Sequence, residues 1–392
     1  MNLFKTKHFS FSAIYFFGWG AYATFALDFL YYSGKIGFTN TEIGLIYGSK
    51  VLLGILFQPL FGLICDYIRS TRKLLLIMSV AAIFLSAGIP LVSSKLSVLV
   101  LIFTYTFSVS AFMPLLDNWV ASECINEERS HFGALRLWGS LGYAVIAIIY
   151  GRMTMYVDIA NIFYGRAILF VIVILLVYFN QHETHAAPKT EEKEKPDVKA
   201  LFSKKEYWLF FIFIFIFCFP IYASNTFFPK LLVEIGSTNQ TIAFFSSFNA
   251  IVEIPFFLYV RKLSKKIGSR GLILVGCLFS TIRLIGFSFA GSVPLLLAAY
   301  LCAAPYVSFF MPGMIYYSYS IAPNNTKAFT LTTLQGFAMG LTGMLGSYIG
   351  GLIIDSKGIQ PMYAYYSIVC IAGIALFLAT SWWLKRGNSH VR

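Results

Sequence analysis

Long apolar runs, separated by short polar segments, follow one another along the whole chain of 392 residues. Each run reaches about 20 residues, the length that an α-helix needs to cross a lipid bilayer. Backbone groups in lipid must bond within their own segment, and the runs are too long for barrel strands, so the pattern predicts helices. The twelve predicted transmembrane helices are 9–33, 42–65, 74–92, 98–121, 134–152, 161–180, 207–231, 240–260, 271–291, 294–316, 328–354 and 361–384.

One interval differs from the rest of the chain. The segment 181–206, QHETHAAPKTEEKEKPDVKALFSKKE, is charged and contains two prolines. It predicts a linker between two six-helix bundles, 1–180 and 207–392. Two segments about half the chain apart, IRSTRKLLL (68–76) and IGSRGLIL (267–274), resemble each other, which predicts that the two bundles are pseudo-symmetric.

The composition agrees with a membrane protein. Only 12% of the residues are charged, about half the share of a soluble domain. This excludes an ordinary cytosolic enzyme, a disordered chain and a disulfide scaffold. The net charge of +13 comes from basic residues in short loops, so membrane topology explains it better than nucleic acid binding. The six cysteines have neither metal nor redox spacing.

The basic residues also predict an orientation. Most loop lysines and arginines fall on one side of the predicted topology. Positive residues concentrate on the cytoplasmic side of membrane proteins. We therefore expect a multi-pass protein of the cell inner membrane with both termini and the linker in the cytoplasm. The first segment, MNLFKTKHFSFSAIYFF, lacks a small-residue cleavage site, so we expect an uncleaved first span.

Eight ionisable residues fall inside predicted spans. A charge at the centre of a span costs about 2.5–3.5 kcal/mol, and such residues are retained where they are paired or face an aqueous cavity. They predict a polar cavity between the halves, where transporters with internal repeats bind substrate. The eight are Asp28, Lys50, Asp117, Arg136, Arg166, Lys230, Glu253 and Arg283.

Similar depths on neighbouring helices suggest partners for these charges. The candidate pairs are Asp28 with Lys50, Asp117 with Arg136, and Glu253 with Arg283. The alternative to a transport role is a purely structural one, in which each pair is a static ion pair that fixes helix register. Arg166, one turn into its span, is expected to extend to the membrane interface. Lys230 lies near the outer end of its span.

A buried carboxylate near an arginine can take up and release a proton near neutral pH. Glu253 is the first candidate for such a carrier, followed by Asp28 and Asp117. Aromatic residues such as Trp19 and Tyr143 offer faces on which a sugar ring could stack, although most of the 40 Phe must face lipid or the interface. Glycines crowd the eleventh span, which predicts close helix approach there.

Several patterns are absent from the sequence. No Walker loop occurs, which argues against ATP-driven transport, and no HExxH or K⁺-filter pattern occurs. His182 and His185 form an isolated pair in the linker and are expected to be solvated rather than to bind metal. We expect no enzyme activity, no cofactor and no metal site.

Four segments resemble a known family. They are GAY at 20–22, LFQPLFGLICD at 56–66 with Arg72 and Lys73 after it, FGALRLWGSLGY at 132–143, and RLIGFSFA at 283–290. The chain resembles the major facilitator superfamily and, more narrowly, its oligosaccharide:proton symporters of the lactose-permease type. The resemblance implies an all-α membrane protein of twelve helices in two six-helix bundles that works by alternating access.

The resemblance also implies roles for individual residues. Arg136 falls on the family's substrate-binding arginine, Tyr143 on its sugar-stacking tryptophan, and Asn118, beside Asp117, on its substrate-binding glutamate. Glu253 falls on a polar position facing the sugar, Asn225 and Lys230 on the cavity side of helix 7, and Arg283 on the arginine tied to proton coupling. The family's helix 10 His and Glu are replaced by Ala303 and Tyr306. Proton coupling would therefore need other residues than in the family, and Glu253 and Arg283 are the candidates.

The sequence thus predicts a monomeric secondary transporter that imports a sugar or glycoside with protons. The alternatives are a proton symporter for a nucleoside or aromatic acid, a drug-efflux antiporter, and a membrane-embedded enzyme or receptor. The predicted substrate-binding residues are Trp19, Asp117, Asn118, Arg136, Tyr143, Asn225, Lys230 and Glu253. The predicted proton-coupling residues are Glu253, Arg283, Asp28 and Lys50.

Overall fold

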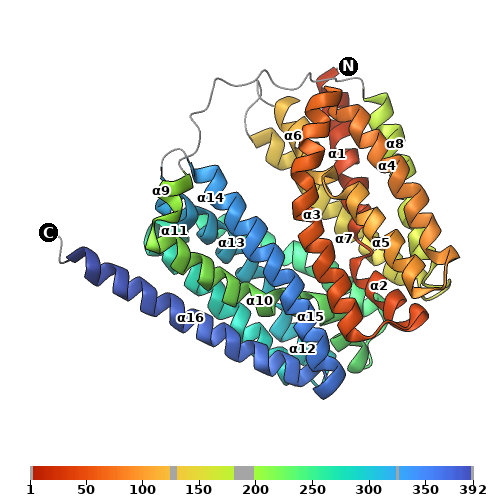
Figure 1. The fold of residues 1–392 in the computed structure, drawn as a ribbon. Helices are drawn as coiled ribbons and strands as arrows, with labels where there is room; N and C mark the ends of the chain where they lie inside the picture. Colours follow the sequence, from red (N-terminus) through yellow and green to blue (C-terminus); the bar gives the residue numbers. More distant parts are fainter. Residues whose placement is uncertain (1–2, 124–129, 181–197, 324–325, 390–392) are drawn as a thin grey trace. The chain divides into compact units, whose positions relative to one another are not determined.

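The computed structural model describes residues 3–123, 130–180, 198–323 and 326–389 (Figure 1). The described residues form α-helices with short 3₁₀ and π segments, and no strand occurs among them. His182, His185 and most of the predicted linker lie outside the described residues. The helical prediction is therefore confirmed for the part of the chain that the structure describes.

In the first half, the helices are α1 (Leu3–Tyr22), α2 (Phe25–Leu30), α3 (Asn40–Ile68), α4 (Thr71–Gly88), α5 (Lys95–Val109), α6 (Phe112–Glu123), α7 (Ser130–Met153) and α8 (Asn161–Phe179). In the second half, they are α9 (Val198–Phe202), α10 (Lys205–Glu234), α11 (Asn239–Ser288), α12 (Val293–Tyr300), α13 (Ala303–Ile321), α14 (Lys327–Thr333), α15 (Gly340–Lys357) and α16 (Ile359–Ser389). Helix α9 and the start of α10 fall inside the stretch predicted as a linker.

Ten of the predicted spans coincide with described helices that are long and apolar enough to cross a membrane. The other two predicted spans, 134–152 and 240–260, lie in α7 and in the first part of α11. Helix α11 joins two predicted spans across Gly268, whose φ of 68° and ψ of −178° are not helical. Glycine tolerates this positive φ because it has no β-carbon.

Several spans are interrupted, which the apolar pattern alone does not predict. The first span passes from α1 through α2 into a π-helical turn, Tyr31–Ile36, and ends at Gly37 with a left-handed φ of 73°. The eleventh span contains a second π-helical turn, Leu334–Met339, between α14 and α15. Single π turns inside helices are frequent at functional sites.

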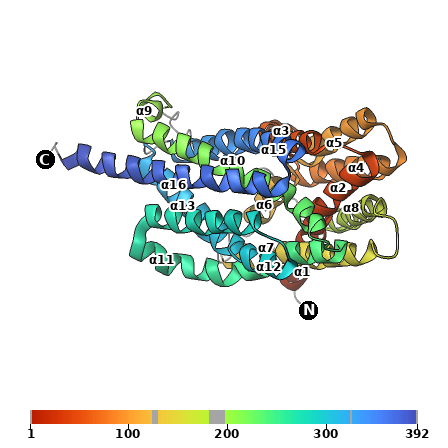
Figure 2. The ribbon, with the colours of Figure 1, turned by 90° about the horizontal axis from the view of Figure 1, so that it is seen from below.

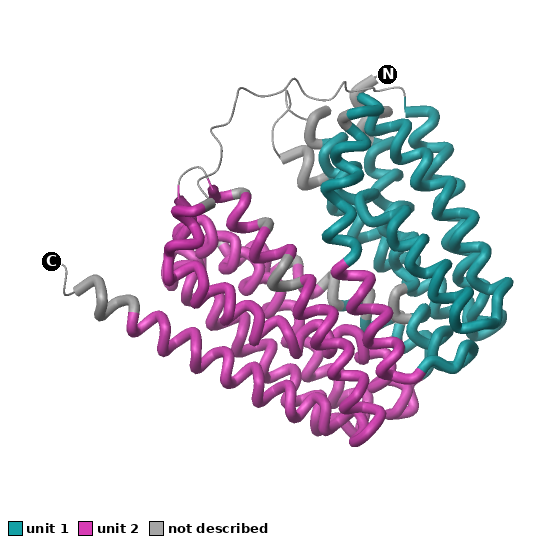
Figure 3. The backbone as a smooth tube through the Cα atoms, viewed as in Figure 1, with its two compact units in different colours: residues 1–38, 53–192, 238–250 teal, residues 39–52, 193–237, 251–392 magenta. Residues whose placement is uncertain are grey.

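The chain divides into two compact units (Figure 3). The first unit comprises residues 1–38, 53–192 and 238–250, and the second comprises 39–52, 193–237 and 251–392. The first part of α3 thus belongs to the same unit as most of the second half of the sequence. The boundary predicted from the sequence, at 181–206, stays a prediction.

In the first unit, α1 packs against α7 and α8, and α4 packs against α8 and α5. Glycines allow the closest of these approaches. A β-carbon at Gly142 of α7 would overlap the backbone of Phe16 on α1. Edge-to-face ring pairs, such as Phe11 with Trp119 at 5.2 Å, fill the remaining space.

In the second unit, α10 packs against α15 and α16 (Figure 2). A row of aromatic rings follows the buried face of α10. The ring centroids of Phe213 and Phe377 on α16 are 4.4 Å apart, and those of Phe210 and Tyr317 on α13 are 4.5 Å apart. These ring contacts stabilise the unit through close packing, because lipid tails are as apolar as the rings and burial alone gains little within a membrane.

The two segments of the predicted internal repeat form corresponding turns. Arg69 has a φ of 55° and Gly268 a φ of 68°, so both lie in the left-handed region. Shortly after each, an arginine binds a neighbouring helix. Arg72 Nε donates to the Val177 carbonyl at the end of α8 at 3.1 Å, and Arg270 donates to groups on α10 and α13. The sequence resemblance between the halves therefore has a structural counterpart.

Candidate functional site

Helices α6 and α7 bring a carboxylate and a guanidinium together in the first unit. Arg136 Nη2 lies 3.6 Å from Asp117 Oδ2. The Arg136 side chain is 53% exposed and that of Asp117 is 27% exposed, so both charged groups remain accessible. This contact confirms the predicted pair. Both groups keep hydrogen-bonding capacity for a ligand, since a guanidinium has five N–H donors and a carboxylate about four acceptor sites.

Helix α1 adds a residue that is not among the site residues predicted from the sequence. The Tyr15 hydroxyl donates to Asp117 Oδ1 at 2.7 Å. Tyr15 is fully buried. It lies in an apolar run of aromatic residues, where a tyrosine carries no signal that separates it from its phenylalanine neighbours. The only available clue is that a buried phenol requires a partner.

Trp19 lies one turn after Tyr15 on α1 and rests against α7. A β-carbon at Gly139 would overlap the Trp19 indole, so only glycine at this position leaves room for the ring. Gly139 follows Arg136 by three residues, which places the two on the same side of α7. Trp19 is half-buried, and its ring centroid lies 6.1 Å from that of Tyr22. The indole and the charged pair thus belong to one region of the first unit.

The other two residues of this unit that were predicted to bind substrate are Asn118 and Tyr143. Asn118 is exposed, and Asp117, not Asn118, is the residue that meets Arg136. One residue along a helix turns the side chain by about 100°, so neighbours on α6 point in different directions. Tyr143, two turns after Arg136, is half-buried. The roles of both in substrate binding stay predictions.

Asp28 pairs with Arg166 rather than with the predicted partner Lys50. The Arg166 guanidinium also donates to the Thr24 hydroxyl. The Arg166 side chain is 4% exposed and that of Asp28 is 5% exposed, so the prediction that Arg166 reaches the membrane interface is wrong. The centroids of the Tyr105 and Phe163 rings each lie 5.2 Å from the Arg166 guanidinium. Attraction between the cation and these rings offsets part of the free-energy cost of burying the charge. The Lys50 ammonium lies 5.0 Å from the Tyr47 ring centroid.

On α10 of the second unit, the Lys230 ammonium lies 3.0 Å from a Glu234 carboxylate oxygen, one turn along the same helix. Asn225 is exposed on that helix. Glu253 on α11 is half-buried, and its backbone carbonyl accepts a hydrogen bond from the Ser308 hydroxyl at 3.3 Å. These positions leave the predicted substrate-binding roles as predictions.

Arg283 is buried in the second unit, with 3% of its surface exposed. Its Nε and Nη2 atoms have no hydrogen-bond partner. The guanidinium lies 5.6 Å from the Tyr306 ring centroid and 5.8 Å from that of Phe287. Two aromatic rings therefore stand beside the buried guanidinium. The pairing of Arg283 with Glu253 stays a prediction.

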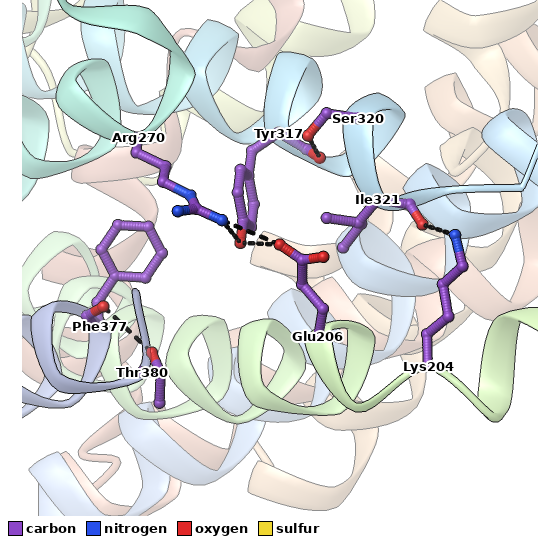
Figure 4. Close-up of polar contacts among 8 residues, drawn as sticks. All are labelled: Lys204, Glu206, Arg270, Tyr317, Ser320, Ile321, Phe377 and Thr380. Carbon is purple, nitrogen blue, oxygen red and sulfur yellow. Dashed lines mark hydrogen bonds and ion pairs between the residues drawn. The ribbon is translucent and has the colours of Figure 1, made fainter. Parts of the chain in front are cut away.

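A polar cluster lies at the start of α10, as Figure 4 shows. Glu206 Oε1 accepts hydrogen bonds from Arg270 at 3.1 Å and from the Tyr317 hydroxyl at 2.9 Å. Nearby, the Lys204 ammonium donates to the Ile321 carbonyl at 3.0 Å and so satisfies the end of α13. Glu206 falls in the predicted linker and Arg270 between two predicted spans, and their contact is not among the pairs predicted from the sequence.

Among the described residues, no group of three metal-ligating side chains occurs.

A family model described as "MFS_1 like family" matches residues 8–365. The chain belongs to this family. Maltose permease of Geobacillus stearothermophilus is 26% identical to this MFS protein, over 95% of this chain and 94% of the permease. Sucrose permease of Escherichia coli is 24% identical, over 92% of this chain and 90% of the permease.

The crystal structure of the nucleoside transporter NupG superposes on this MFS protein with a TM-score of 0.83. The two are 18% identical, and the match covers 97% of this chain and 99% of NupG. The likeness shows the fold: an all-α membrane protein of the MFS type with twelve transmembrane helices. The fold prediction is confirmed, and so is the resemblance on which it partly depended.

Proposed function

We propose that this MFS protein imports a sugar or glycoside together with protons by alternating access. In this proposal it is a monomer in the cell inner membrane with both termini in the cytoplasm. The maltose and sucrose permeases among its relatives support the class of substrate. The excess of basic residues in one set of loops supports the orientation.

The single observation that carries the proposal is the Arg136–Asp117 pair beside Trp19. A sugar has hydroxyls that both donate and accept hydrogen bonds, and its ring has apolar faces. Arg136 supplies donors, Asp117 supplies acceptors, and the Trp19 indole supplies a flat apolar surface. The three residues therefore match the chemistry of a sugar better than that of an apolar drug.

In this proposal, residues of the second unit complete the transport cycle. Asn225, Lys230 and Glu253 contribute to the substrate site, and Glu253 carries the proton with Arg283 as its fixed positive charge. The half-buried position of Glu253 and the unpaired N–H groups of Arg283 support these roles. The buried Asp28–Arg166 pair acts instead as a structural link.

A proton-flux screen in proteoliposomes tests the proposal. Maltose, sucrose, a nucleoside or an aromatic acid is added outside, and the external pH is followed with a dye. Inward symport with a sugar makes the outside more alkaline, and only the sugars are expected to do so. If only the nucleoside or only the aromatic acid makes the outside more alkaline, that class of solute is the substrate instead of a sugar. Acidification of the outside indicates an antiporter, and no response to any solute overturns the proposal.

The Glu253→Gln variant tests the coupling site. It is expected to keep sugar counterflow, which needs no net proton movement, while sugar-dependent alkalinisation disappears. Asp158→Asn is the matched control, because Asp158 is a half-exposed carboxylate in the turn between α7 and α8. Sugar accumulation by Glu253→Gln under a proton gradient would remove Glu253 from the coupling mechanism.

A further inference from the structure

Asp117 has two partners on different helices. Its Oδ1 accepts a hydrogen bond from the Tyr15 hydroxyl at 2.7 Å, and its Oδ2 lies 3.6 Å from Arg136 Nη2. Each carboxylate oxygen is therefore committed to a different group. Hydrogen bonds that involve an ionised group are shorter and stronger than neutral ones, so the Tyr15 contact fixes the carboxylate more firmly than an ordinary hydrogen bond.

Tyr15 is well suited to hold a neighbour in place. Its side chain is fully buried, so the phenol is not shared with surrounding solvent. Helix α1 is held closely against α7, since a β-carbon at Gly142 would overlap the Phe16 backbone. The phenol is therefore carried by a closely packed helix pair, and close packing around a supporting residue keeps a binding group in its productive orientation.

The same helix places the aromatic surface. Trp19 follows Tyr15 by four residues, so both lie on one face of α1. The indole rests on Gly139, one turn after Arg136 on α7. One face of α1 thus meets the charged pair through Tyr15 and meets α7 through Trp19.

We infer that Tyr15 is a positioning residue for substrate binding. Its hydroxyl holds Asp117 Oδ1, so that Oδ2 and the Arg136 guanidinium face the sugar hydroxyls in a fixed arrangement. Tyr15 itself does not touch the substrate. The inference rests on the proposed function, because it assigns a support to the same sugar site.

The Tyr15→Phe variant removes only the hydroxyl. A hydrogen bond to a charged group contributes enough to change an equilibrium by about tenfold or more. We expect the KM for sugar uptake to rise about tenfold and the maximal rate to stay within about twofold. Tyr22→Phe is the matched control, because Tyr22 is on the same helix and its hydroxyl donates to the Val109 carbonyl at 3.1 Å. Its KM is expected to stay at the wild-type value.

A second variant separates positioning from direct contact. Because Tyr15 acts through Asp117, adding Tyr15→Phe to Asp117→Ala, which leaves no side-chain acceptor for the phenol, should raise the KM no further than about twofold. If the two effects multiply, Tyr15 acts independently of Asp117 and the inference is overturned. A wild-type KM for Tyr15→Phe overturns it as well, while the proposed function stands. If the wild-type protein transports no sugar, the proposed function itself fails.

Discussion

The Asp355 carboxylate at the end of α15 accepts a hydrogen bond from the Thr41 hydroxyl at 2.6 Å and from the Thr41 backbone N–H at 2.8 Å. It also accepts from the side-chain and backbone N–H groups of Asn40, at 2.7 and 3.2 Å. The first N–H groups of a helix have no partner within that helix. Asp355 therefore caps α3 from a helix more than 300 residues away in the sequence.

Glycines let the two helices approach closely beside this cap. A β-carbon at Gly44 would overlap the Ser347 carbonyl, and one at Gly48 would overlap the Met344 backbone. Close approach of this kind is typical of small residues at helix contacts in membranes. Glycines of the eleventh span have the same role, because a β-carbon at Gly351 would overlap the Asn40 backbone and one at Gly346 would overlap the Phe219 carbonyl. The close helix approach predicted for this span from the sequence is therefore confirmed.

Removal of the cap is expected to destabilise the second unit. Asp355→Ala should lower the free energy of unfolding by about 1–2 kcal/mol, the usual contribution of a helix cap. Asp355→Asn should fall between this variant and the wild type, because the amide still accepts but lacks the charge that favours a helix N-terminus. Ser356→Ala, an exposed neighbour, serves as the control. Thermal unfolding in detergent measures all three, and equal stability of Asp355→Ala and the control would contradict the expectation.

The Asp28–Arg166 pair predicts a different pattern. Loss of one partner leaves a buried charge, so Asp28→Leu or Arg166→Met alone should cost about 3–5 kcal/mol. The double variant should recover at least half of this loss, since apolar residues of similar size replace a buried ion pair at little cost. Thermal unfolding compares the three proteins. A double variant less stable than either single variant would argue against a structural pair.

The same double variant separates structure from coupling. If the pair is only structural, sugar-dependent alkalinisation should persist in the folded double variant. Loss of that alkalinisation with intact sugar counterflow would return Asp28 to the set of proton-coupling residues.

Acidic pH is expected to weaken the contact between Lys35 and Asp158, a carboxylate in the turn between α7 and α8. The hydrogen bond from Lys35, together with one from the Ala160 N–H, holds the pKa of Asp158 below its ordinary 3.8. A carboxyl group with a lowered pKa in the folded state stabilises that state above its unfolded pKa. This contribution is lost as the pH falls through the folded-state value. Because the pair is half-exposed, the effect should be small.

The Asp158→Asn variant provides the measurement. Its unfolding temperature should lie slightly below that of the wild type at neutral pH, and the two should converge at a pH well below 4. High salt should reduce the difference at neutral pH, since salt screens exposed charges. A difference that stays constant from neutral to acidic pH would show that ionisation of Asp158 is not its cause.

The sequence predicted the spans well because their length and apolar character are local properties. Their interruptions depend on contacts with other helices, so the π-helical turns at Tyr31–Ile36 and Leu334–Met339 carried no clear signal. A glycine in the sequence does not by itself predict a helix break. Helices break at Gly268 and end at Gly37, where φ is positive, whereas the glycines of α15 lie inside a regular helix.

The charged pairs show the same limit. Asp117 and Arg136 flank one short connection, so similar depth was enough to predict their contact. Asp28 and Arg166 are 138 residues apart, and depth alone does not tell which helix stands beside α2. Tyr15 was missed because its role depends on a hydroxyl in an otherwise apolar run.

Sugar binding to the purified protein tests the central claim most directly. Isothermal titration of maltose or sucrose compares the wild type with Arg136→Lys, which keeps the positive charge but loses the planar, forked donor geometry. The account predicts that the sugar Kd rises at least about tenfold, with an unchanged unfolding temperature. Wild-type affinity in Arg136→Lys and also in Arg136→Gln would contradict a sugar site at the Arg136–Asp117 pair.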